Sequence, residues 1–173
     1  MSDVRVAVVM GVSGSGKTTL ASALAGAWGA TFLDADDFHS DEARALMASG
    51  QPLTDSLRQP WVARIADALQ RCVADGTRVT LAFSGLRRQH RDALRAAGVP
   101  LRFLFLRGKA PLIGERMRER RGHYMPVSLL ASQFATLEAP VDEEDITVLP
   151  VDLPPDAQLR LALQALAAPS QDR

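Results

Sequence analysis

The sequence predicts an α/β domain built on a parallel β-sheet. Short apolar runs rich in β-branched residues alternate along the chain with longer segments of helical period. Such alternation is typical of strand–helix–strand units, in which the helices cover both faces of the sheet. The chain has 173 residues, of which 47% are hydrophobic, enough for one core without disulfides or a structural metal. We therefore expect a single globular unit.

Five runs of residues are expected to form the strands of this sheet. They are Val4–Met10, Thr31–Asp34, Arg78–Ser84, Leu101–Arg107 and Ile146–Asp152. A helical period marks the segments Lys17–Trp28, Asp41–Ser49, Ser56–Ala74, Gln89–Ala97, Pro111–Arg120, Val127–Leu137 and Asp156–Ala167. Gly50, Gly76 and Gly98 follow three of these segments, where glycines commonly cap helices.

The composition excludes several classes of partner. Lys and Arg together number 20, and so do Asp and Glu, so the formal net charge is zero. The chain therefore lacks the excess positive charge that attracts nucleic acids and anionic membranes to a protein. No apolar run approaches the roughly 18 residues of a membrane span, and the first residues lack the apolar stretch of a signal peptide. Cys72 is the one cysteine, which excludes an internal disulfide. We expect a cytoplasmic protein with a small-molecule partner.

The stretch GVSGSGKT lies between the first expected strand and the first expected helix. It matches G-x-x-x-x-G-K-[ST] at every fixed position, and this strand-to-helix context is that of a P-loop. Glycines let backbone N–H groups curl around a phosphate, toward which the following helix directs its positive end. We expect Lys17 to contact the β- and γ-phosphates of ATP, and Thr18 to bind Mg²⁺. The expected nucleotide contacts in this stretch are Gly11, Val12, Ser13, Gly14, Ser15, Gly16, Lys17, Thr18 and Thr19.

The catalytic acids are expected in FLDADDF, after the second strand. The strand at 78–84 ends in Ser84 and Gly85, not in the aspartate that many P-loop ATPases use for magnesium. Asp34 and Asp36 lie two residues apart at a strand end, so both carboxylates would face the edge that carries the P-loop. We expect Asp34 to hold Mg²⁺ through water, and Asp36 to accept the proton of the acceptor hydroxyl. The alternative is that these acids cap a helix or lie in solvent.

Arginines that could stabilise the charge on a transferring phosphoryl group cluster in ERMRERRGHYMP. Arg116 and Arg120 are placed to reach ATP, whereas a solvated helix face explains Arg118 and Arg121. The glycine and proline near the end of this stretch suit a mobile segment. We therefore expect a lid at about 116–126.

Four longer stretches resemble the gluconate kinases, or gluconokinases, which are small P-loop kinases related to shikimate kinase. They are MGVSGSGKT, FLDADDFH, MASGQPLTDSLRQPW and RGHYMPVSLLASQFATLEAP. RGHYMP and SQFATLE are the most specific, because relatives acting on other acceptors lack them. The resemblance implies MgATP-dependent phosphorylation of the 6-hydroxyl of D-gluconate to 6-phosphogluconate, in gluconate catabolism. It also implies a P-loop NTPase fold of nucleoside-monophosphate-kinase type, with a five-stranded parallel sheet in the order 2-3-1-4-5, and commonly a homodimer.

The resemblance also extends the set of expected site residues. The P-loop and paired-acid assignments carry over unchanged, and Arg116 and Arg120 become nucleotide contacts, with Arg120 also among the catalytic residues. The stretches bordering the sugar-acid pocket contribute Asp36, His39, Arg58, Ser84, His123 and Gln133. The chain departs from the usual family pattern at Thr54 and Leu57, where an asparagine and an acid are common, and in SGLRRQHRD.

Two other functions stay open at this point. Arg58 and the paired acids would serve a kinase for another small polyol acid, such as shikimate, equally well. The P-loop could also be the switch of a non-catalytic, nucleotide-gated binding protein. A guanine-specific switch is excluded, because the chain has no asparagine for an N-K-x-D motif. We expect one kinase domain over residues 1–168 and a flexible C-terminal tail at 169–173.

Overall fold

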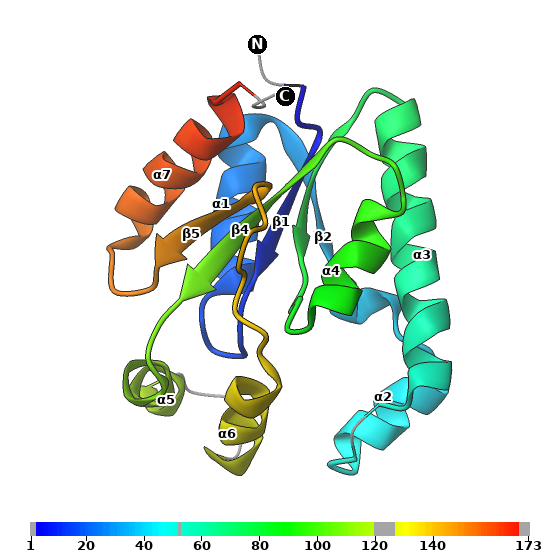
Figure 1. Ribbon diagram of the computed structural model, residues 1–173, viewed down its shortest axis with the longest axis vertical. Coiled ribbons are helices and arrows are strands. Elements are labelled where there is room, and N and C mark those ends of the chain that lie inside the picture. Colours follow the sequence, from blue (N-terminus) through cyan, green and yellow to red (C-terminus); the bar gives the residue numbers. More distant parts are fainter. Residues whose placement is uncertain (1–2, 52, 120–126, 170–173) are drawn as a thin grey trace.

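The computed structural model describes residues 3–51, 53–119 and 127–169. Most of the lid expected at 116–126, and most of the tail expected at 169–173, lie outside these ranges, so both stay predictions. Within them, one sheet carries helices on both of its faces (Figure 1). No helix of the described part is long and apolar enough to span a membrane.

Five parallel strands form the sheet, in the order β2-β3-β1-β4-β5. The strands are β1 (Val6–Met10), β2 (Ala30–Asp34), β3 (Arg78–Ala82), β4 (Leu101–Arg107) and β5 (Ile146–Pro150). At the centre, Val8 of β1 pairs with Leu81 on one side and with Phe103 on the other. The expected fold class, strand number and strand order are therefore confirmed.

The expected helices all form, with ends within two residues of those expected. They are α1 (Lys17–Trp28), α2 (Asp41–Ala48), α3 (Asp55–Ala74), α4 (Arg88–Arg95), α5 (Ala110–Glu119), α6 (Val127–Thr136) and α7 (Pro155–Ala167). Gly50, Gly76 and Gly98 take φ values of 80°, 79° and 73° just beyond three of them, so the expected glycine caps are confirmed. One short 3₁₀ helix, η1 (Ala35–Phe38), was not expected.

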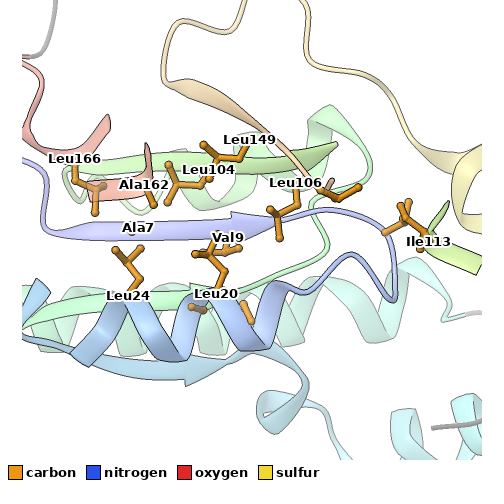
Figure 2. Close-up of a cluster of buried hydrophobic side chains, with 14 of the residues drawn as sticks. Ala7, Val9, Leu20, Leu24, Leu104, Leu106, Ile113, Leu149, Ala162 and Leu166 are labelled. Atoms are coloured by element: carbon orange, nitrogen blue, oxygen red, sulfur yellow. The ribbon is translucent and has the colours of Figure 1, made fainter. Parts of the chain in front are cut away.

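Two apolar clusters fill the space on the two faces of the sheet. Alternate residues of β1 point to opposite faces, so that Ala7 and Val9 join one cluster and Val8 joins the other. Figure 2 shows the first cluster, in which Leu24 of α1 and Leu166 of α7 pack against the sheet. Residues of α3 and α4 complete the second cluster on the opposite face. This packing on both sides fixes the strands, and with them the loops at their ends.

The carboxyl ends of the five strands share one edge because the strands are all parallel. The P-loop follows β1, η1 follows β2, and the segment leading to α4 follows β3. Beyond α6 the chain returns to the same edge, where the N–H of Glu138 donates to the carbonyl oxygen of Leu86 (2.7 Å). Four separate parts of the sequence therefore meet at this edge.

Candidate active site

The P-loop lies between β1 and α1, as the motif predicts. The N–H of Gly11 donates to the carbonyl oxygen of half-buried Ser84 (3.1 Å), which ties the loop to the chain beyond β3. Gly11 has a φ of 151°, and a Cβ added to it would lie 2.9 Å from the carbonyl oxygen of Leu106. Glycine is therefore required at this position. Gly16, at φ 96°, precedes α1 without a side-chain cap, so the first amides of that helix face the loop.

Lys17 begins α1 and turns back over the loop. Its Nζ donates to the carbonyl oxygens of Gly11 (3.0 Å) and Val12 (3.1 Å). Burial lowers the pKa of Lys17 to about 8, while the negative charges of Asp36 and Asp34 oppose that shift. The ammonium group therefore persists at neutral pH and is lost as the pH passes about 8. Its position places a positive charge directly at the phosphate-binding loop.

The two acids of FLDADDF lie at this edge, but one premise behind their assignment is wrong. β2 ends at Asp34, and Asp36 belongs to η1, so the two side chains do not project from one continuous strand. Asp34 instead caps the turn, since its Oδ1 accepts from the N–H of Asp36 (2.9 Å). The side chain of Asp36 is 85% exposed. Both carboxylates still raise the pKa of Lys17, as groups gathered at one edge would.

An aromatic stack of His39, Trp61 and Phe83 lies beside Asp36. The Nε2 of His39 is 3.6 Å from Oδ1 of Asp36, and its ring stacks on that of Trp61, with centroids 4.2 Å apart and planes inclined by 17°. The indole N–H of Trp61 donates to the carbonyl oxygen of Ala35 (2.7 Å), and its ring also contacts Phe83. His39 holds the pKa of the Asp36 carboxyl below its usual range. Asp36 is therefore ionised at neutral pH.

Two arginines that the sequence did not single out hold the carbonyl groups of η1. The guanidinium of Arg44 donates to the carbonyl oxygen of Asp36 (3.4 Å), and Nε of Arg64 donates to that of Phe38 (2.8 Å). Trp61 was missed as well, although it lies in the quoted stretch QPW. No spacing rule connects these residues with η1, because they come from α2 and α3 and meet it only in the fold.

Arg58, expected from the sequence to border the sugar-acid pocket, lies in the first turns of α3. Its guanidinium donates to Oδ1 of Asp55 (3.1 Å), and 23% of its side chain is exposed. His90 of α4, in the stretch SGLRRQHRD, was not expected. Burial, together with the positive charges of Arg58 and Arg87, lowers the pKa of His90 to about 4. His90 is thus neutral at neutral pH, and its buried Nε2 has no hydrogen-bond partner within the described ranges.

The remaining expected residues come from α5, from α6 and from the segment between them. Gln133 of α6 contacts the P-loop, where its Oε1 accepts from the N–H of Ser13 (2.6 Å) and its Nε2 donates to Oγ of Ser13 (2.8 Å). Arg116 lies half-buried on α5. Arg120 and His123 lie outside the described residues, so their expected roles stay predictions.

The residues present fit a phosphate and Mg²⁺. The Oγ of Ser15 is buried without a hydrogen-bond partner in the part of the chain described, and it lies inside the tight loop at Gly11. Thr18 is exposed in the first turn of α1, and half-buried Asp34, whose pKa is raised by burial, supplies carboxylate oxygens. The described residues hold no group of three or more Asp, Glu, His or Cys side chains suited to a metal. Mg²⁺ at phosphoryl-transfer sites commonly takes one or two protein oxygens and completes its shell with phosphates and water.

A P-loop whose lysine lies near two carboxylates at the same sheet edge puts the chain in the class of P-loop phosphotransferases. A family model described as an AAA domain matches residues 6–142. Gluconokinase from Gluconobacter oxydans is 41% identical over 155 residues, which are 90% of this chain and 87% of that protein. The chain belongs to the gluconokinase family.

Solved structures agree with this assignment. The crystal structure of a gluconokinase from Sinorhizobium meliloti superposes with a TM-score of 0.87, at 40% identity, over 96% of this chain and 94% of the other. An unliganded sugar kinase from Janibacter superposes with a TM-score of 0.86, at 45% identity, over 94% of both chains. The structural likeness therefore extends over nearly the whole chain.

Proposed function

We propose that this chain transfers the γ-phosphoryl group of ATP to the 6-hydroxyl of D-gluconate, giving 6-phosphogluconate. The observation that carries the proposal is the kinship with gluconokinases over about nine tenths of the chain. The geometry of the edge supports it, because a P-loop and an ionised carboxylate are what a phosphoryl donor and a hydroxyl acceptor require.

On the donor side, the P-loop amides and the N-terminus of α1 bind the phosphates of ATP. Lys17 stabilises the charge that develops on the transferring oxygens, since its ammonium persists at neutral pH. Thr18 and Asp34 are the residues that would hold Mg²⁺, Asp34 through water, and the metal would neutralise phosphate charge. Arg116 and Arg120 are proposed as further nucleotide contacts, and Arg120 also as a catalytic residue.

On the acceptor side, Asp36 orients the 6-hydroxyl of gluconate and takes its proton. A bond forms between that oxygen and the γ-phosphorus, the bond between this phosphorus and the oxygen of ADP breaks, and the proton passes to the carboxylate of Asp36. His39 and Arg58 are proposed to contact the sugar acid. The same holds for Ser84 and His123, whereas Gln133, expected from the sequence to border the sugar-acid pocket, is not proposed as a direct contact, because both polar groups of its side chain bond to Ser13.

Two further properties belong to the proposal. We place the protein in the cytoplasm, where ATP and a soluble sugar acid are both available. We also propose a homodimer, which the resemblance to the family implies. Sedimentation velocity tests the dimer, because a single species at the 18.7 kDa of one chain would contradict it.

The test of the function is a coupled ADP-release assay with the purified chain, ATP and Mg²⁺. The acceptors are gluconate, other aldonates, shikimate and nucleoside monophosphates, and Lys17→Met serves as the inactive control. We expect ADP release that depends on gluconate, with a phosphate monoester at C6 of the product by ³¹P NMR. Release that depends on shikimate would move the assignment to another polyol-acid kinase. Slow hydrolysis that no acceptor stimulates would favour the nucleotide-gated binding protein.

A further inference from the structure

The side chain of Gln133 is joined to the P-loop by two hydrogen bonds across 120 positions of sequence. The N–H of Ser13 requires an acceptor, which is Oε1 at 2.6 Å, and the amide Nε2 then donates to Oγ of Ser13 at 2.8 Å. Both bonds are partly buried. The contact fixes the backbone and the side chain of Ser13 together, so it constrains the position of the loop and not only one rotamer.

Ser13 is the third residue of the loop and directly precedes Gly14, Ser15 and Gly16, which complete the loop before α1. Gly14 and Gly16, which follow it, have φ values of 79° and 96°, and the curl of the loop depends on these two soft positions. The loop start is fixed by Gly11, whose N–H donates to the carbonyl oxygen of Ser84. Gln133 adds a second fixed point, at Ser13, between the loop start and the glycines.

The segment that carries Gln133 is also attached to the acceptor side of the edge. Two residues beyond α6, the N–H of Glu138 donates to the carbonyl oxygen of Leu86 (2.7 Å), and its carboxylate accepts from the N–H of Arg88 (3.4 Å). Leu86 lies between β3 and α4, and Arg88 is the first residue of α4, the helix that carries His90. One short stretch, 133–138, therefore bonds to the P-loop at one end and to the loop after β3 at the other.

Such a bridge matters for phosphoryl transfer, which depends on the distance and alignment between donor and acceptor. A misplacement of about 1 Å can cost a factor of about 10² in rate. From these contacts we infer that Gln133 is a positioning residue that holds the phosphate loop in place relative to the acceptor loop. The catalytic part of this inference rests on the proposed gluconate kinase function, whereas its nucleotide-binding part does not.

The test compares Gln133→Met, which keeps the length of the side chain and loses both hydrogen bonds, with Ser132→Ala, an exposed neighbour on the same helix. The first readout is the Kd of a non-hydrolysable ATP analogue by calorimetry, which needs no acceptor. We expect Gln133→Met to raise this Kd about fivefold, because the loop must then be ordered on binding. We expect Ser132→Ala to match the parent protein in Kd and Tm, and Gln133→Met, which leaves the partly buried N–H of Ser13 without its acceptor, to melt no more than about 4 °C below the parent.

The second readout is turnover with gluconate. Gln133→Met should lower kcat about tenfold, equivalent to about 1.4 kcal/mol, with the KM for gluconate changed less than about twofold. Ser13→Ala should cost less, and it should cost nothing further in the Gln133→Met background, since both changes remove the same contact. Gln133→Glu keeps acceptors for the N–H and O–H of Ser13, so it should retain the Tm while its added charge weakens nucleotide binding further.

An unchanged Kd for the analogue in folded Gln133→Met would overturn the inference, as would a kcat within twofold of the parent. A lower Tm with normal activity per folded molecule would also overturn it, because the contact would then serve stability alone. If the parent protein releases no ADP with gluconate, the proposed function fails, and the analogue Kd still decides the role of Gln133.

Discussion

Replacing Asp36 by asparagine removes one negative charge and one proton acceptor while keeping the shape of the side chain. The side chain is 85% exposed, and Nε2 of the buried His39 ring lies 3.6 Å from its Oδ1. Because the carboxylate itself lies largely in solvent, its contact with the buried His39 ring contributes little to stability, and the free energy of unfolding should change by less than about 1 kcal/mol. The effect of the substitution should therefore appear in catalysis.

The expected loss in kcat is about 10² or more, the lower range for a positioned general base, which corresponds to about 2.7 kcal/mol of activation free energy. A second effect follows from electrostatics. Asp36 is the largest of the charges that raise the pKa of Lys17, so its loss should let Lys17 deprotonate below the present value of about 8. Nucleotide binding by Asp36→Asn should then weaken at a lower pH than in the parent protein.

The assay is steady-state ADP release with gluconate and ATP varied separately, at a pH well below 8 so that Lys17 stays charged. Asp37→Asn is the matched control, because it makes the same substitution in the same turn at an exposed residue without a proposed role. We expect this control to keep parental kcat. An Asp36→Asn enzyme with kcat within threefold of the parent would move the proton-accepting role to another residue, with His39 the next candidate.

Three further predictions concern the loop and its support. The Kd for ATP should rise as the pH increases through about 8, because the ammonium group of Lys17 loses its proton there. Calorimetry measures this Kd, and the control Lys17→Met should show no such rise. Trp61→Phe keeps a ring beside His39 but removes the buried hydrogen bond from the indole N–H to the carbonyl oxygen of Ala35; urea unfolding should show a loss of about 0.5–1.5 kcal/mol, and an unchanged midpoint would contradict this. Gly11→Ala should abolish the rise in Tm on adding ATP, because no space exists for its Cβ; a normal rise would show that the loop adapts.

The parts of the fold that could be predicted from the sequence are those with local signals. The run at β1 is apolar at every position because the strand is buried on both faces, and this marks it as a central parallel strand. The P-loop could be predicted equally well, because the residues that phosphate binding requires, among them Gly11, Lys17 and Thr18, lie within eight consecutive positions. The strand order came from resemblance, because the periodicity of a strand says nothing about its neighbours.

The parts that could not be predicted depend on contacts between distant segments. Alternation along FLDADDF places Asp36 on a strand, but the carboxylate of Asp34 offers the backbone an N-cap, and the chain turns into η1 instead. The indole of Trp61 meets the turn 26 residues earlier, and Gln133 meets Ser13 across 120 residues. The motifs QPW and SQFATLE already identify the two stretches that contain Trp61 and Gln133. Only the fold shows to which distant atoms these two side chains donate or accept hydrogen bonds.

The opposite pKa shifts of Asp34 and Asp36 bear on the proposed role of Asp36 as proton acceptor. Burial raises the pKa of Asp34, whereas His39 lowers that of Asp36, although the residues are two positions apart. A carboxylate with a lowered pKa is a weak base and would remove an early proton poorly. Phosphoryl transfer through a loose transition state does not need early deprotonation, so the proton can move late, when the hydroxyl has become strongly acidic. Under the proposed function Asp36 would act chiefly by orientation, and the stacked rings of His39 and Trp61 beside its otherwise exposed side chain fit that role.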